Sequence, residues 1–195
     1  MSSTATKDER AAAQGAGRGG SPWRRSWPAA LGVLVAAGTV YGLGDGRDVA
    51  PVVAASGLVY LAAAVIGRAM AAWWMFAVTF VVVGVDKFFG VEGLPWLLGM
   101  AAVLAVVGLV ARHDGPWWAF PLQTAAMVVC GSVAWIALRS EPVVGGLLVA
   151  AGLLGHAAWD LCHHRSGRVV GRSLAEFCMV LDVLLAAAVV WVVWV

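Results

Sequence analysis

Long apolar stretches fill the chain from residue 27 onward, and short polar or glycine-rich breaks separate them. A helix needs about 20 mostly apolar residues to cross a bilayer. The breaks, where Gly, Pro and charged residues gather, divide the chain into seven stretches of about this length. These stretches run over 27–43, 49–68, 70–90, 94–111, 117–138, 142–163 and 173–195. The pattern predicts an all-α, polytopic membrane protein with one seven-transmembrane-helix bundle.

Residues 1–26 have a different composition from the rest of the chain. They are rich in Ser, Ala and Gly, show no helical or strand spacing, and hold seven of the 24 charged residues. We therefore expect a disordered cytoplasmic tail at 1–26 and a transmembrane domain at 27–195. The pair Arg24-Arg25 is similar to the start of an export signal, but no small-residue cleavage site follows. An uncleaved first membrane helix is the better interpretation.

The composition excludes several classes of protein. Hydrophobic residues make up 62% of the chain and charged residues only 12%, whereas soluble domains carry about a quarter charged residues. The three Cys form no CxxC pair, which argues against a disulfide scaffold. Nothing in the chain predicts nucleic-acid binding. The expected surroundings are a lipid bilayer, and the oligomeric state is left open.

The basic residues predict an orientation, because they favour the cytoplasmic side of a membrane. With the N-terminus inside and seven crossings, ten of the 13 Lys and Arg residues face the cytoplasm. The C-terminus then lies outside. All eleven Trp residues fall near one of the two membrane boundaries, as expected for an aromatic belt. We expect a multi-pass protein of a bacterial inner membrane.

Ionisable residues inside apolar helices point to function, because they are costly to place in hydrocarbon. Most of them lie in the sixth and seventh stretches. In the sixth, His156 and Asp160 continue a stripe that begins with glycines, and in the seventh Glu176 and Asp182 interrupt an apolar run. The expected catalytic candidates are Asp160, Asp182, His156 and Glu176. Because Glu176 and Asp182 are six residues apart, we expect only one of them to face His156.

Helical spacing limits the metal sites that these residues can form. The pair His156 and Asp160, and the pair Asp160 and His164, are each one turn apart and can share an ion. His156 and His164 are separated by about 12 Å of helix rise, so one ion cannot easily bind both. A site therefore needs one pair together with Asp182 or Glu176. Imidazole with carboxylate suits zinc, iron or manganese, and we expect a divalent metal such as zinc.

Plain structural roles compete with these hypotheses. The residues from His163 to Arg172 are also what a basic loop facing lipid headgroups would contain. Asp160 could pair with Arg165 or Arg168, and a hydrogen bond to His156 would by itself account for Asp182. Each of these alternatives predicts a structural rather than a chemical role.

The segment GHxxWDxxHHR, from Gly155 to Arg165, followed by AEFC and Asp182, resembles small multi-pass membrane proteins of high-GC bacteria. The resemblance covers roughly residues 155–183 and implies a membrane fold, but no activity. The general format is also similar to seven-span metal hydrolases and membrane terpene cyclases, although Ser56 lacks the neighbouring His of the former. A retinal protein is excluded, because residues 173–195 contain no Lys.

Three functional classes remain open. The first is a membrane-embedded enzyme that acts on a lipid or isoprenoid substrate, with acid/base or metal-assisted chemistry between the sixth and seventh stretches. The second is a proton or metal-ion transporter or channel. The third is a non-catalytic membrane subunit. The nearly pure apolar outer halves of 142–163 and 173–195 favour a one-sided pocket over a path through the membrane.

Overall fold

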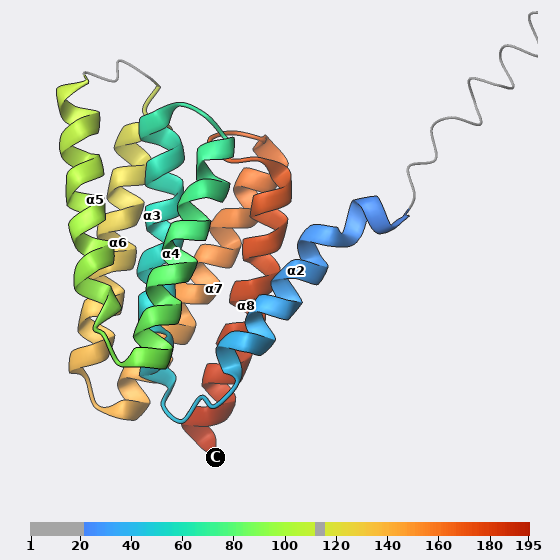
Figure 1. Ribbon diagram of the computed structural model, residues 1–195, viewed down its shortest axis with the longest axis vertical. Helices are drawn as coiled ribbons and strands as arrows, with labels where there is room; N and C mark the ends of the chain where they lie inside the picture. The colour runs from blue at the N-terminus through green and yellow to red at the C-terminus, as the bar shows by residue number, and fades with distance from the viewer. Residues whose placement is uncertain (1–21, 112–115) are drawn as a thin grey trace, which may run out of the picture.

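The computed structural model describes residues 22–111 and 116–195, and all the regular elements in these ranges are helical. Most of the helices run side by side, they alternate in direction along the chain, and the first one lies obliquely at the edge of the bundle (Figure 1). In chain order they are α2 (Pro22–Val40), the 3₁₀ helix η1 (Gly46–Val49), α3 (Ala50–Ile66), α4 (Met70–Phe89), α5 (Gly93–Val110), α6 (Phe120–Arg139), α7 (Pro142–Ser166) and α8 (Arg172–Trp194).

Six of these helices are long and apolar enough to cross a membrane, and they correspond to the second to seventh predicted stretches. The predicted break between the stretches 49–68 and 70–90 is confirmed. Gly67 ends α3 in the left-handed region, at φ +69°, where its N–H donates to the Ala63 carbonyl. Gly90 ends α4 in the same way, at φ +67°. Glycine reaches this conformation without the penalty of a side chain, so both positions stop a helix.

The first predicted stretch differs from the other six. Its helix, α2, begins at Pro22 rather than near residue 27, and its apolar part covers only Ser26–Val40. The helix can begin at Pro22 because proline is well tolerated in a first helical turn. The helix ends before Gly42, which has φ +73°. The predicted boundary between tail and membrane domain therefore falls inside α2, and residues 1–21 of the predicted tail lie outside the described residues.

Helix α3 forms the centre of the bundle. Most of its length is buried, and it packs against α4, α5, α6 and α7. On the outside, α4 and α5 expose large apolar side chains, among them Phe80, Trp96 and Val103. The remaining extensive contacts join α7 to α8 and α8 to α2. A central apolar helix surrounded by helices with apolar outer faces is the arrangement expected in lipid, where hydrophobic side chains need not be hidden.

Gly145 lies at a point of tight packing near the start of α7. A Cβ added there would overlap the Ala137 carbonyl oxygen and lie 2.7 Å from the Arg47 side chain. We expect Gly145→Ala to lower the free energy of unfolding by about 1–3 kcal/mol, because overpacking forces the backbone to shift. Gly155→Ala is the matched control on the same helix, since nothing lies within 4 Å of its Cβ position. Thermal unfolding in detergent checks this, and equal melting temperatures of the two variants would contradict it.

Candidate functional site

Three ionisable side chains meet in the interior, two from α7 and one from α8. Nδ1 of His156 lies 2.8 Å from Oδ2 of Asp182 and 3.3 Å from Oδ2 of Asp160. Both carboxylates are fully buried and His156 is 5% exposed. The hydrogen bond between His156 and Asp182 matches the expectation that one acidic residue of the last helix faces His156. The i, i+4 spacing on α7 brings Asp160 to the same ring nitrogen.

The local sequence explains how α8 comes close enough to complete this group. Helices α7 and α8 form the most extensive helix pair of the structure. Where η1, α7 and α8 meet, Gly46 and Gly146 lie against the side chains of Val189 and Val193. Small residues allow such close approach of helices. Once α8 is docked in this way, its rotation turns Asp182 inward.

Tyr60, from the central helix α3, is the fourth member of the cluster. Its hydroxyl donates a hydrogen bond of 2.5 Å to Oδ1 of Asp160. Its ring lies edge-on to His156, with 5.3 Å between the ring centroids, and also contacts His163. Tyr60 is 1% exposed. Below, "the cluster" means His156, Asp160, Asp182 and Tyr60.

A second polar layer lies beside the cluster, toward the C-terminal end of α7. Nε2 of Gln123 on α6 lies 3.4 Å from Nε2 of His163 and donates to the Trp118 carbonyl. Nδ1 of His163 lies 3.0 Å from the carbonyl of Trp159. His163 and Gln123 are both buried. The buried polar region therefore involves three helices besides α8, namely α3, α6 and α7.

Several buried polar atoms of these two layers have no hydrogen-bond partner within the described part of the chain. In the cluster they are Nε2 of His156, Oδ2 of Asp160 and Oδ1 of Asp182. In the second layer they are Oε1 of Gln123 and Nε1 of Trp159. Buried polar groups are normally paired, and each unpaired one costs about 1–3 kcal/mol. The cluster therefore retains donor and acceptor atoms that the described residues leave without a hydrogen bond.

Of the site residues predicted from the sequence, three lie together in the structure and two do not. It brings together His156, Asp160 and Asp182, and these form the group whose ligand atoms all lie within 4.8 Å of one another. Glu176 and His164 are partly exposed and are not members of that group. The third side chain beside His156 and Asp160 is thus Asp182 from α8.

The structure bears on two of the structural alternatives, namely the partner of Asp160 and the basic loop expected to begin at His163. Asp160 accepts a hydrogen bond from Tyr60, which differs from the predicted pairing with Arg165 or Arg168. The Arg168 guanidinium instead lies over the ring of Trp118, 5.1 Å from its centroid. His163 belongs to α7, which continues to Ser166, and it is buried there, which differs from the predicted position in a basic loop.

Sequence reasoning missed Tyr60 and Gln123. Both are uncharged, so a search for ionisable residues within apolar stretches passes over them. A usable signal was present nevertheless. Tyr60 is one of only two tyrosines, and Gln123 has the only amide side chain within the seven predicted stretches. A rare hydrogen-bonding side chain in an apolar helix requires a partner.

A polar cavity of about 900 Å³ lies at the opposite end of the bundle, around η1 and the start of α5. Its walls include Asp48, Asp86 and Lys87, and Lys87 donates to the Thr39 carbonyl. Close to this cavity, a side-chain hydrogen bond from Arg47 holds the pKa of Asp45 below its usual range. The cavity contains charges of both signs.

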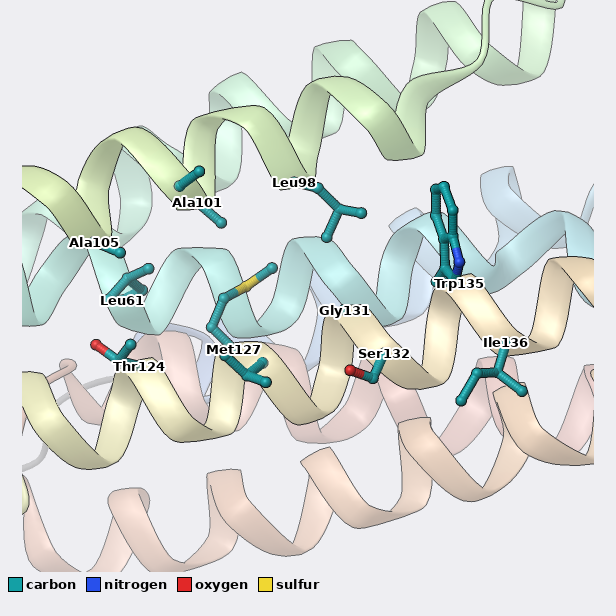
Figure 2. A pocket seen from close by; sticks show the side chains of 12 residues that line it. Leu61, Leu98, Ala101, Ala105, Thr124, Met127, Gly131, Ser132, Trp135 and Ile136 are labelled. Atoms are coloured by element: carbon teal, nitrogen blue, oxygen red, sulfur yellow. The ribbon is translucent and has the colours of Figure 1, made fainter.

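An apolar groove of about 560 Å³ runs between α5 and α6, with α3 behind it. Figure 2 shows Leu98 and Ala101 on one side, Met127 opposite them, and Trp135 toward one end. Val128 and Ile136 on its rim are 62% and 53% exposed, so the groove lies on the outer face of the bundle. Its wall residue Leu61 directly follows Tyr60 in α3.

Comparisons with protein-family models, with curated proteins and with solved structures find no match for this chain. The chemistry of the cluster is therefore the basis for assigning a function. Its imidazole and two carboxylates can transfer protons in a buried setting, and the same three side chains could hold a metal ion.

Proposed function

We propose that the protein is a membrane-embedded enzyme that acts on a lipid or isoprenoid substrate, with the cluster as its reactive centre. One observation supports this most directly. A hydrogen-bonded histidine and two carboxylates are buried among apolar helices, and each retains an atom that has no partner among the described residues. Side chains of this kind within spanning helices are rare and generally functional. In a water-poor site their electrostatic effect on a reacting group is large.

The proposed setting is a bacterial inner membrane, crossed seven times with the N-terminus in the cytoplasm. Helix α2 would provide the first crossing. The turns that contain Arg68 and Arg168 lie at the same end of the bundle (Figure 1), which agrees with a cytoplasmic face rich in arginine. The cluster would then lie nearer that face, because Asp160 is six residues from the end of α7.

The groove between α5 and α6 supports a substrate that arrives from the bilayer. Its volume of about 560 Å³ is within the range of small-molecule sites, about 300–1,000 Å³. Its lining is nearly all apolar and suits a hydrocarbon chain. Two of its lining residues are Leu61, which directly follows Tyr60, and Met127, which lies one helical turn after Gln123. A lipid held there would have its tail outside the bundle and its reactive end near the cluster.

The test compares membrane lipids from cells that express the wild-type chain, the Asp182→Asn variant or no chain. We expect untargeted mass spectrometry to find lipid species that change with the wild type and not with Asp182→Asn. Glu141→Gln is the matched control, since it makes the same carboxylate-to-amide change at an exposed position before α7. Identical lipid profiles with and without the wild-type chain would refute the proposal.

A second candidate is a proton or metal-ion transporter. The polar cavity near η1 favours it, because an ion path needs an opening at that end of the bundle. Against it, the buried positions of α7 and α8 on that side of the cluster are apolar, including Val149, Leu153 and Leu185, all 0% exposed. Flux of H⁺ or Zn²⁺ into liposomes that contain the purified chain decides between the two. Flux that Asp182→Asn abolishes would favour transport.

A further inference from the structure

We propose that His156, Asp160 and Asp182 together bind one divalent cation of the zinc class. The chemical role of this ion rests on the proposed function, in which it would activate a substrate, whereas its binding can be measured without any substrate. Three observations support the site: the spacing of the ligand atoms, the balance of charge, and the partner of the outer carboxylate oxygen.

The spacing of the three ligand atoms suits a small ion. Zinc binds nitrogen and oxygen ligands at about 2.0–2.2 Å, which places neighbouring ligands of a tetrahedral site roughly 3.3–3.5 Å apart. The two distances from Nδ1 of His156 to the carboxylates are 3.3 Å and 2.8 Å. The whole set lies within 4.8 Å. To complete the geometry, the distance from His156 to Asp182 would grow by about 0.5 Å and the two carboxylate oxygens would converge on the ion. Rotation about side-chain bonds can provide both movements.

The charge of the cluster also favours a cation. Oxygens of Asp160 and Asp182 converge on the single atom Nδ1, and one proton there can hydrogen-bond well to only one of them. The Asp160 oxygen on this side receives no hydrogen bond from the described residues. With both carboxylates ionised, even a protonated His156 leaves a net negative charge, which is costly where water is excluded. A divalent ion bound through Nδ1 of a neutral His156 makes the group electrically neutral.

The hydrogen bond from Tyr60 to Asp160 is of the kind that second-sphere residues donate to metal ligands. It donates to Oδ1 and leaves Oδ2 directed toward His156, without a partner among the described residues. Carboxylate ligands of metals are commonly fixed by such a hydrogen bond to their outer oxygen. Tyr60 itself is fixed by close packing within the buried centre of α3. The ligand oxygen of Asp160 is therefore oriented before an ion arrives.

The ligand set also indicates which ions are suitable. One imidazole with two carboxylates suits zinc, manganese or ferrous iron. Calcium takes six to eight oxygens and magnesium retains an octahedral shell of water and oxygen, neither of which this apolar surrounding offers. Three protein ligands leave one tetrahedral position open, as in catalytic zinc sites. That position could hold a water molecule or the polar end of a lipid.

The test uses the full chain, purified in detergent, stripped with a chelator and titrated with Zn²⁺ or Co²⁺ alone. We expect one equivalent of Zn²⁺ per wild-type chain and the visible absorption of tetrahedral Co²⁺. His156→Ala and Asp182→Asn should each lose both signals. His164→Ala should retain them, because His164 lies outside the cluster, although the sequence alone made it a candidate ligand.

Each outcome bears on the proposal. Absence of Zn²⁺ binding by the wild type, or equal binding by Asp182→Asn, would overturn the metal site. If a variant fails to fold, the wild type still decides, because a bound ion should raise its melting temperature as Zn²⁺ is added. A wild-type chain that binds Zn²⁺ but alters no lipid would keep the site and reject the enzyme. An altered lipid profile without Zn²⁺ binding would keep the proposed enzyme and reject the metal site.

Discussion

Replacing His156 with alanine is expected to lower the free energy of unfolding of the metal-free protein by about 3–5 kcal/mol. The physical reason is that His156 is the only basic group in contact with the carboxylates of Asp160 and Asp182 in the described structure. Without it, two buried acids face each other across the space that the ring occupied. One of them must take up a proton or draw water into the bundle, and the folded state loses stability in either case.

The measurement is thermal and denaturant unfolding of the chelator-treated protein in detergent. His164→Ala, on the same helix but partly exposed, should change stability by no more than about 0.5 kcal/mol. The double variant His156→Ala/Asp182→Asn supplies a sharper check. Removing one carboxylate relieves the repulsion, so the double variant should be more stable than the sum of the single effects predicts. Simple additivity would show that the histidine contributes packing rather than charge compensation.

The helices could be predicted largely because their ends carry local signals. Gly67 and Gly90 stop α3 and α4 by adopting a left-handed conformation, and a glycine at such a position is visible in the sequence. Length and apolar composition then identify six helices that could cross a membrane. The start of α2 was less predictable, because Pro22 reads equally well as a loop residue and as the first residue of a helix.

The site was predictable only in part, and the reason is rotation about helix axes. Spacing along α7 places His156 and Asp160 on one face, so this pair follows from the sequence. Whether Glu176 or Asp182 completes the site depends on how α8 docks against α7, and no local signal fixes that. The rotation of α7 likewise decides whether His163 or His164 faces the interior, because these neighbours in sequence point in directions about 100° apart.

The contribution of α3 could not be predicted from charge at all. In the sequence, Tyr60 stands in a run of apolar residues, where a tyrosine is ordinarily an interfacial or packing residue. Only the central position of α3 brings its hydroxyl to Asp160. The cluster is therefore a property of three packed helices, and its least conspicuous residue in the sequence provides the hydrogen bond to Asp160.

This role leads to the second main prediction, for Tyr60→Phe. The substitution keeps the ring and its packing and removes only the hydroxyl that donates to Oδ1 of Asp160. We expect the affinity for Zn²⁺ to fall by about 10–100-fold, which is the usual effect of losing a second-sphere hydrogen bond. Competition with a chelator of known affinity measures this change, and the Co²⁺ absorption reports whether the coordination geometry survives.

Ser56→Ala is the matched control, because Ser56 lies one turn before Tyr60 on α3 and its buried hydroxyl donates only within the helix, to the Val52 carbonyl. It should leave the Zn²⁺ affinity unchanged even if it lowers the melting temperature slightly. The comparison separates orientation from stability. A purely structural tyrosine would lower the melting temperature and leave the affinity as in the wild type, whereas a positioning tyrosine must lower the affinity of a chain that is still folded. Unchanged Zn²⁺ affinity in Tyr60→Phe would therefore remove Tyr60 from the metal site while leaving the three ligands in place.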